Sequence, residues 1–201
     1  MSPASSRAEP LTRDDFVDAA LRVTKRAGLD GLTMRAVAAE LGVSPMAIYY
    51  HLRDKDELVT LAVEAVLSRI GPLDPGPDGW EAALRRYLLS AWQELTRYPG
   101  VGAFLIGTPT MGTTPQRTAQ QVRFFEDAGF PPRAAGLAWA FALTYLHGRL
   151  SVDARLRGQP ARGSAFTGLH RRDYVEFGVD SVIAGLRAML PRHPDGDRSP
   201  A

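Results

Sequence analysis

Residues 28–54 carry helix start and stop signals at such short intervals that only short helices fit between them. A glycine ends a helix readily, and a Ser, Thr or Asp, or a Ser-Pro pair, favours the start of the next one. A helix over residues 45–53 would be too short to be stable alone in water, so neighbouring helices must hold it. The spacing predicts a helix-turn-helix. The signals are Gly28, Thr33, Gly42, Ser44-Pro45 and Asp54.

The rest of the chain shows helical periodicity and no alternating strand pattern, so we expect an all-α protein. A Pro- and Gly-rich stretch over residues 71–79 marks the expected boundary between two parts. The helix that precedes this stretch would link the two parts physically. The expected helices cover residues 12–27, 33–41, 45–53, 54–70, 80–98, 101–107, 115–128, 132–153 and 172–190.

Composition limits the class of protein. The chain has no cysteine, which excludes disulfides and Cys-based zinc sites. It shows no signal-peptide core and no apolar run of the ~20 residues that span a bilayer, so we expect a soluble, cytoplasmic protein without membrane contact. Residues 1–70 hold 9 basic and 10 acidic side chains, so overall charge gives no indication of nucleic-acid binding. Any such function must come from the placement of particular residues.

The helix expected over residues 45–53 has an outer face that is unusual for a solvated surface. Ile48 and Leu52 point to one side and would pack on the two preceding helices. The opposite side and its flanks carry small, apolar and aromatic groups rather than Lys, Glu and Gln. Such a face suits the major groove of DNA, where thymine methyl groups accept apolar contacts. Packing against the second half of the chain is the alternative. The residues of this face are Met46, Ala47, Tyr49, Tyr50 and His51.

The stretch GLDGLTMRAVAAELGVSPMAIYYHLRDKDEL resembles the DNA-binding segment of the tetracycline-repressor (TetR) family of bacterial transcription regulators. The resemblance is carried by Gly28, Thr33, Arg35, Val37-Ala38, Gly42-Val43-Ser44, Tyr49, His51, Lys55 and Leu58, and Leu52 stands where the family often has Phe. It implies phosphate contacts at Thr33, Tyr49, His51 and Lys55 and base contacts at Met46, Ala47 and Tyr50. Thr33 and Ser44 are also capping residues, and Arg35 has Glu40 and Asp30 as possible partners. The full set of implied DNA contacts is Thr33, Arg35, Ser44, Pro45, Met46, Ala47, Tyr49, Tyr50, His51 and Lys55.

The resemblance also implies an organisation and a mode of action. We expect a flexible N-terminus (1–10), a helix-turn-helix DNA-binding domain (11–56), an effector-binding and dimerisation domain (57–190) and a flexible tail (191–201). The resemblance implies a homodimer that binds a near-palindromic operator in double-stranded DNA. It also implies that the protein is a repressor, and that a small-molecule effector releases it from the operator. The alternative is a DNA-binding protein controlled by a protein partner, or by no effector.

The second half of the chain concentrates aromatic residues, which form either plain core or the wall of a ligand site. Residues 80–153 hold 11 of the 17 aromatic side chains, including all three tryptophans. Because the family binds effectors between these helices, the resemblance implies a pocket. Its candidate residues are Leu88, Trp92, Phe104, Gln121, Phe125, Trp139, Thr144 and His147.

Small residues on the last two long helices allow close helix packing, either within one chain or between two. The resemblance implies a four-helix interface between two copies of the chain. The candidate interface residues are Ala138, Ala142, Tyr174, Gly178, Ser181, Val182, Gly185 and Met189.

Catalytic and metal-binding patterns are not evident. The segment GTPTMGTT (107–114) has the glycine spacing of a phosphate loop but Thr113 where the lysine should stand. The four histidines are scattered, and neither H-E-x-x-H nor G-x-S-x-G occurs. We therefore expect a protein that is not an enzyme and needs no metal or other cofactor.

Overall fold

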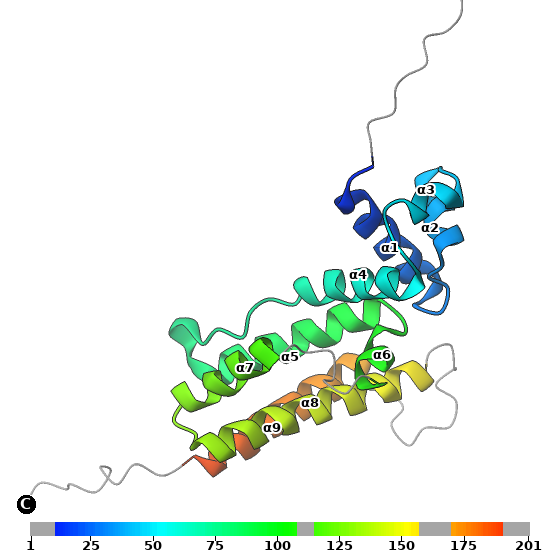
Figure 1. The fold of residues 1–201 in the computed structure, drawn as a ribbon. Coiled ribbons are helices and arrows are strands. Elements are labelled where there is room, and N and C mark those ends of the chain that lie inside the picture. Colours follow the sequence, from blue (N-terminus) through cyan, green and yellow to red (C-terminus); the bar gives the residue numbers. More distant parts are fainter. Residues whose placement is uncertain (1–10, 108–114, 157–169, 191–201) are drawn as a thin grey trace, which may run out of the picture. The chain divides into compact units, whose positions relative to one another are not determined.

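The computed structural model describes residues 11–107, 115–156 and 170–190, drawn in colour in Figure 1. These residues form α-helices and one short 3-10 helix, and the described part contains no strand, as the sequence predicts. They divide into two compact units. The first comprises the chain up to Arg69 together with the turn Arg97–Val101, and the second comprises Ile70–Thr96 and the chain from Gly102 onward.

The first unit holds four helices, and a side-chain cap precedes each one. They are α1 (Arg13–Ala27), α2 (Met34–Leu41), α3 (Pro45–Tyr49) and α4 (Lys55–Ser68). Each cap accepts a hydrogen bond from a backbone N–H of the first helical turn, which would otherwise lack a partner. The caps are Thr12, Thr33, Ser44 and Asp54, as the sequence signals predict.

The core of the first unit is built from one face of each helix. The α2–α3 turn depends on Gly42, whose φ of 70° lies in the left-handed region. α2 packs on both α1 and α3, and α4 packs on α1. α1 therefore contacts both α2 and α4, and α3 is held through its contact with α2. The fully buried side chains of the first unit include Leu32, Val37, Ile48, Leu58 and Val66.

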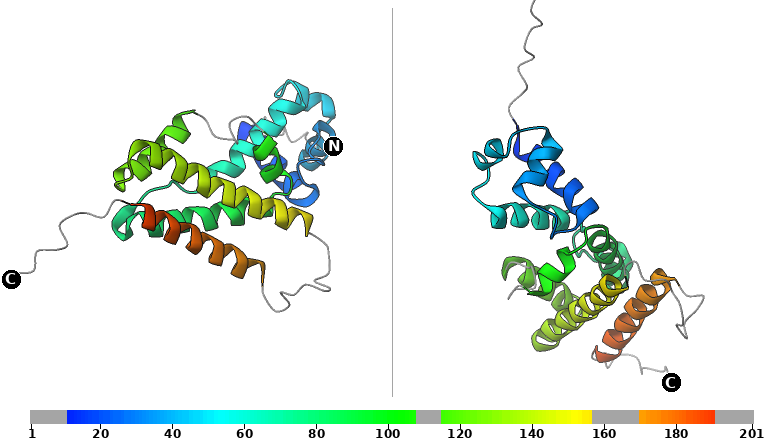
Figure 2. Two further views of the ribbon diagram at one scale, coloured as in Figure 1. Left: turned by 90° about the horizontal axis from the view of Figure 1, so that it is seen from below. Right: turned by 90° about the vertical axis from the view of Figure 1, so that its right-hand side faces the viewer.

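The second unit is a bundle of longer helices. In it α8 packs on both α7 and α9, and Figure 2 shows α8 and α9 side by side from two directions. Its centre is aromatic: the Phe125 ring contacts Trp80, Phe124 and Phe130. The elements are η1 (Gly76–Asp78), α5 (Gly79–Arg97, whose last residue belongs to the first unit), α6 (Val101–Gly107), α7 (Pro115–Asp127), α8 (Pro132–Arg155) and α9 (Arg171–Met189).

Packing places α4 in the first unit, so the compact unit extends beyond residue 56, where we expect the DNA-binding domain to end. That functional boundary stays a prediction. The predicted flexible segments 1–10 and 191–201 and most of the segment 107–114 lie outside the described residues. Among the described helices, none has the length and apolar character needed to cross a lipid bilayer.

Candidate functional site

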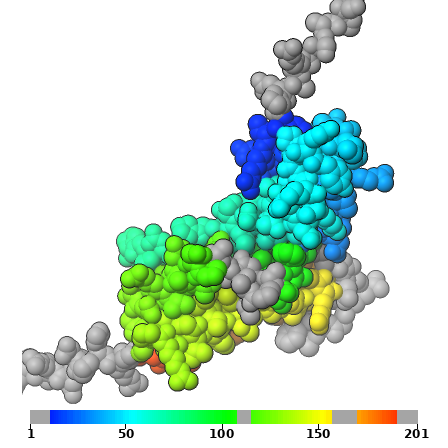
Figure 3. Space-filling model, in the orientation of Figure 1, coloured from blue at the N-terminus to red at the C-terminus, as the bar shows by residue number. Residues whose placement is uncertain are grey.

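The outer face of α3 is uncovered in the first unit. Tyr50 is 84% exposed and Met46 is 64% exposed, whereas Ile48 on the opposite side is fully buried. Ala47 is half-buried, and Tyr49 is exposed. The space-filling view shows the segment that carries α3 at the surface (Figure 3). The separation of inner and outer residues is the one that the sequence predicts.

The length of α3 differs from the expected nine residues. The helix ends at Tyr49, and Tyr50 forms its C-cap. The chain then turns, with the His51 and Leu52 N–H groups both donating to the Ile48 carbonyl. This turn directs Leu52 into the core and leaves Asp54 in position to cap α4. A helix continued to Arg53 would have occupied the residues that form this turn, so the prediction was wrong for residues 50–53.

Two predicted contacts lie outside α3, Arg35 on α2 and Lys55 at the start of α4. Arg35 and Lys55 are exposed, and among the described residues neither has an ion-pair partner. Glu40, the possible partner of Arg35, instead accepts hydrogen bonds from Arg22 and Arg26 of α1 at 2.7 and 3.1 Å. These bonds, first that from Arg22, hold the pKa of the Glu40 carboxyl below its usual value. The Arg35 guanidinium is therefore available to an anion.

Thr33 and Ser44 both act as caps. The Thr33 hydroxyl accepts a hydrogen bond from the Ala36 N–H at 3.1 Å, and the Ser44 hydroxyl accepts one from the Ala47 N–H at 3.3 Å. Both residues are exposed, as is Pro45 at the first position of α3. Capping uses one lone pair of each hydroxyl oxygen, so the hydroxyl hydrogens stay available to an outside acceptor.

His51 lies beside α1. Its ring centroid is 4.8 Å from that of Phe16, at a tilt of 41°, and the imidazole edge remains exposed. Since Phe16 is buried, this contact joins the residues that follow α3 to the core of the unit. The structure therefore gives His51 a packing role in addition to the phosphate contact that the resemblance implies.

A cleft of about 600 Å³ lies next to His51, between the start of α1 and the outer side of α4. Its wall contains four acidic side chains, and one of them, Glu57, accepts hydrogen bonds from the backbone N–H and the guanidinium of Arg53. The first of these bonds is the larger cause of a lowered Glu57 pKa. The wall also contains Arg13 and Arg53, so its formal charge is −2 and it disfavours phosphate binding in this cleft. The acidic residues are Asp54, Asp56, Glu57 and Glu64.

In the second unit, Gln121 is a buried amide with an unused acceptor. Gln121 is 4% exposed, and its Nε2 donates to the Tyr87 hydroxyl at 3.0 Å, while its Oε1 has no hydrogen-bond partner. Burial raises the pKa of Tyr87, and nearby Arg117 opposes that change. The Tyr87 ring lies edge-on to Trp139 at 5.9 Å. A buried acceptor without a hydrogen-bond partner raises the free energy of the folded state, so a ligand that donates a hydrogen bond to the Gln121 Oε1 would bind favourably there.

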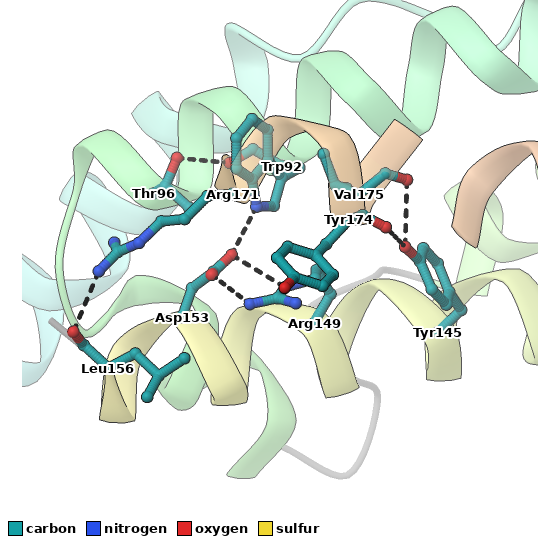
Figure 4. A network of polar contacts seen from close by, with 9 residues as sticks. All are labelled: Trp92, Thr96, Tyr145, Arg149, Asp153, Leu156, Arg171, Tyr174 and Val175. Carbon is teal, nitrogen blue, oxygen red and sulfur yellow. Dashed lines mark hydrogen bonds and ion pairs between the residues drawn. The ribbon is translucent and has the colours of Figure 1, made fainter. Parts of the chain in front are cut away.

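Trp92 takes part in a partly buried polar network that joins α5, α8 and α9 (Figure 4). Its indole N–H donates to the Asp153 carboxylate at 2.8 Å, and Arg149 forms a bidentate ion pair with the same carboxylate. The Arg149 guanidinium also lies over the Tyr174 ring, 5.8 Å from its centroid. The Trp92 indole N–H and the Tyr174 ring thus have partners within the chain, and the pocket and interface roles of these two residues stay predictions.

The remaining pocket candidates are scattered. Leu88 and Phe125 are fully buried in the aromatic core, whereas Phe104 is 39% exposed. The Thr144 side chain is exposed and donates to the Ala140 carbonyl at 2.8 Å. His147 is buried, which lowers its pKa. The structure therefore brings together Gln121 and Trp139 through Tyr87. Sequence reasoning missed Tyr87 because its helical spacing from Leu84 and Leu88 marks it only as core.

The predicted interface residues on α8 and α9 divide into two sets. Ala138, Ala142 and Val182 are buried within this single chain, and Gly178 lies against the Tyr145 ring. Ser181, Gly185 and Met189 are exposed and share the outer side of α9 with Phe177. α8 also carries three exposed large apolar residues that we did not predict at an interface, and these are Leu137, Phe141 and Val152.

The described residues contain no group of three or more His, Asp and Glu side chains that could hold a metal ion.

Comparison with known proteins gives the family. Residues 16–62, which include α2 and α3, match the model of the bacterial regulatory proteins of the tetR family. The class D tetracycline repressor protein of Escherichia coli is 30% identical over 125 residues, 61% of this chain. That match covers 57% of the relative, less than two thirds of its length.

Two further similarities extend over more of the chain. The class C tetracycline repressor protein of Escherichia coli is 30% identical over 159 residues, which are 77% of this chain and 69% of the relative. The crystal structure of TetR from Acinetobacter baumannii AYE superposes with a TM-score of 0.74 at 26% identity, over 89% of this chain and 98% of that one. The helix-turn-helix face and the helical second unit thus occur together in a known family, and this chain belongs to the tetR family of bacterial regulatory proteins.

Proposed function

We propose that this chain is a DNA-binding transcriptional regulator that acts as a homodimeric repressor and is released from its operator by a small molecule. The observation that carries the proposal is the uncovered face of α3, where Met46, Tyr49 and Tyr50 are exposed on a helix that packs on α2. The chain acts by binding and not by catalysis.

In this proposal α3 enters the major groove. Met46, Ala47 and Tyr50 lie against base edges and thymine methyl groups, and Tyr49 and two exposed cations contact phosphates. Two copies related by a two-fold axis place their α3 helices one DNA turn apart, about 34–36 Å or a multiple of it, on a near-palindromic site. Because Arg35 and Lys55 are those cations in each copy, the plot of log K against log salt should have a slope of about −4 for the dimer.

The effector in this proposal enters the second unit near Gln121. The unpaired Oε1 of Gln121 accepts a hydrogen bond from the effector, and Tyr87 and Trp139 supply aromatic contact. The effector shifts the balance between DNA-competent and DNA-incompetent dimers. One of the similar structures, TetR-Q116A of Acinetobacter baumannii AYE, holds minocycline, which makes minocycline a reasonable first compound to test.

The DNA-binding test is a fluorescence-anisotropy titration onto the intergenic DNA beside the gene of this protein, against scrambled DNA and at two salt concentrations. We expect the native DNA to be preferred by ~10³-fold or more. Tyr50→Ala should erode that preference. Lys55→Ala should weaken binding to both DNAs alike. Lys25→Ala, at the only other lysine of the chain, is the matched control. The proposal would be overturned if the protein binds both DNAs weakly and neither Tyr50→Ala nor Lys55→Ala changes that binding.

The effector test adds minocycline and other candidate compounds to the preformed complex. A compound that releases the DNA should lose its effect on Gln121→Leu and keep it on Gln93→Leu, whose side chain is exposed on α5. Equal release from both variants would place the effector elsewhere.

A further inference from the structure

The uncovered face of α3 carries a methionine that is open to solvent. The chain has five methionines, of which Met1 and Met111 lie outside the described residues. Among the other three, Met34 is 6% exposed, whereas Met46 is 64% exposed and Met189 is exposed as well. Met46 lies in the first turn of α3, and Met189 is the last residue of α9. Each of the two units therefore presents one accessible thioether among its described residues.

A thioether gives this chain a chemistry that its other side chains lack. Because the chain has no cysteine, no thiol can respond to an oxidant. The sulfur lone pair of a methionine attacks one oxygen of hydrogen peroxide, the O–O bond breaks, and the other oxygen leaves as water with both protons. The sulfur is oxidised by two electrons and the peroxide is reduced by two. The product is a methionine sulfoxide, which is polar and chiral where the original side chain was apolar.

The position of Met46 gives this change a consequence for DNA binding. In the proposed complex Met46 lies against base edges and thymine methyl groups, which accept an apolar side chain. A sulfoxide oxygen at this position would lose its hydrogen bonds to water when α3 enters the groove, and that loss is unfavourable unless a donor replaces them. A two-fold dimer carries the change twice. Oxidation of Met46 should therefore weaken the complex.

We propose that Met46 is an oxidation site through which hydroperoxides release this chain from its operator, independently of any small-molecule effector. Methionine sulfoxide reductases restore the thioether, so the release is reversible. The consequence for DNA binding rests on the proposed function. The selective oxidation of Met46 over Met34 does not, because it follows from the difference in their exposure.

The first measurement maps oxidation along the full chain after treatment with hydrogen peroxide. Arg35 stands between Met34 and Met46, so trypsin separates these two methionines and mass spectrometry of the digest reports each one. We expect the sulfoxide to form at least ~10-fold faster at Met46 than at Met34, because oxidation follows exposure. The intergenic DNA, added before the peroxide, should slow the reaction at Met46 and leave the reaction at Met189 unchanged.

The second measurement is the anisotropy titration onto the intergenic DNA, with peroxide-treated and untreated samples of each protein. Treatment should weaken binding of the wild type at least ~10-fold, and a methionine sulfoxide reductase should restore it. Met46→Leu keeps the volume and removes the sulfur, so treatment should not change its affinity, whatever the starting value. Met189→Leu is the matched control, and treatment should weaken its binding as it does that of the wild type. Met46→Gln, which is polar like the sulfoxide, should bind more weakly than Met46→Leu before any treatment.

The outcomes separate this inference from the proposed function. If Met34 reacts as fast as Met46, or if a chain oxidised at Met46 binds the native DNA as well as before, the inference is overturned and the proposed function is untouched. A loss of binding that persists in treated Met46→Leu also overturns it, since the sensitive residue would then lie elsewhere. An untreated wild type with no preference for the native DNA overturns both.

Discussion

Tyr50 and His51 are consecutive residues with different surroundings. Tyr50 is the most exposed large apolar or aromatic side chain of the described residues, whereas the His51 ring lies on Phe16 of α1. A side chain that contacts nothing in its own chain is available to a partner, and one that covers a buried ring contributes to stability. Substitutions at the two positions should therefore separate binding from folding.

We predict that His51→Ala lowers the free energy of unfolding by about 1 kcal/mol, a typical value for a lost side-chain contact. Tyr50→Ala should leave it unchanged within about 0.5 kcal/mol, because Tyr50 is 84% exposed. Urea denaturation followed by circular dichroism measures both. A stability loss at Tyr50 equal to that at His51 would mean that the α3 face is covered in solution.

His147 makes stability depend on pH. Burial lowers its pKa below the ordinary value of about 6.5, so the unfolded chain binds a proton at a higher pH than the folded chain does. The contribution of the neutral ring is fully present above about pH 6.5 and is lost as the pH falls toward the folded pKa. We predict that the wild type loses more stability than His147→Gln between pH 7.5 and 5. The difference is bounded by one proton, about 1.4 kcal/mol per pH unit. Parallel pH profiles of the two proteins would contradict it.

At the scale of the elements, the sequence predicts helix starts better than the ends of short helices. Every start in the first unit has a local chemical cause, a hydroxyl or carboxylate that accepts from the first turn. The end of α3 has a tertiary cause, the burial of Leu52, which no local signal announces. The candidate effector site also depends on tertiary contacts that the local sequence does not show. The Gln121–Tyr87 bond joins residues 34 positions apart, so side-chain spacing along one helix cannot reveal it.

Gly178 shows how closely α8 and α9 pack. A Cβ atom there would overlap the Tyr145 ring, whose hydroxyl donates to the Tyr174 and Val175 carbonyls at 3.3 and 3.1 Å. We predict that Gly178→Ala lowers the free energy of unfolding by about 1–3 kcal/mol, as overpacking does. Gly136→Ala, where a Cβ meets open space on α8, should be neutral or stabilise by up to about 1 kcal/mol. Urea denaturation of both variants tests this, and equal effects would show that α8 and α9 are less close than in the structure.

At the scale of the whole molecule, the outer sides of α8 and α9 carry more exposed apolar surface than one chain alone explains. Phe177 is 76% exposed, and Leu137, Phe141 and Met189 each exceed half. Several large exposed apolar side chains on neighbouring helices are typical of an interaction surface. This surface differs from the predicted set of interface residues, because Ala138, Ala142 and Val182 are already buried within the chain. α8 packs on α7 and α9 within the same chain. The proposed dimer would therefore be formed by the larger, exposed side chains.

We predict that Phe177→Asp and Phe141→Asp each shift the protein from dimer toward monomer, because an unpaired carboxylate in an apolar interface costs several kcal/mol and a two-fold axis introduces it twice. The dimer dissociation constant, measured by sedimentation equilibrium, should rise at least ~100-fold, which is about 2.7 kcal/mol. Ile106→Asp is the control, since Ile106 is an exposed apolar residue on α6, outside α8 and α9. The monomeric variants should also lose preference for a palindromic site over a single half-site, because each α3 would then bind independently. A wild-type chain that is already monomeric, or variants that stay dimeric, would show that this apolar surface serves a different partner.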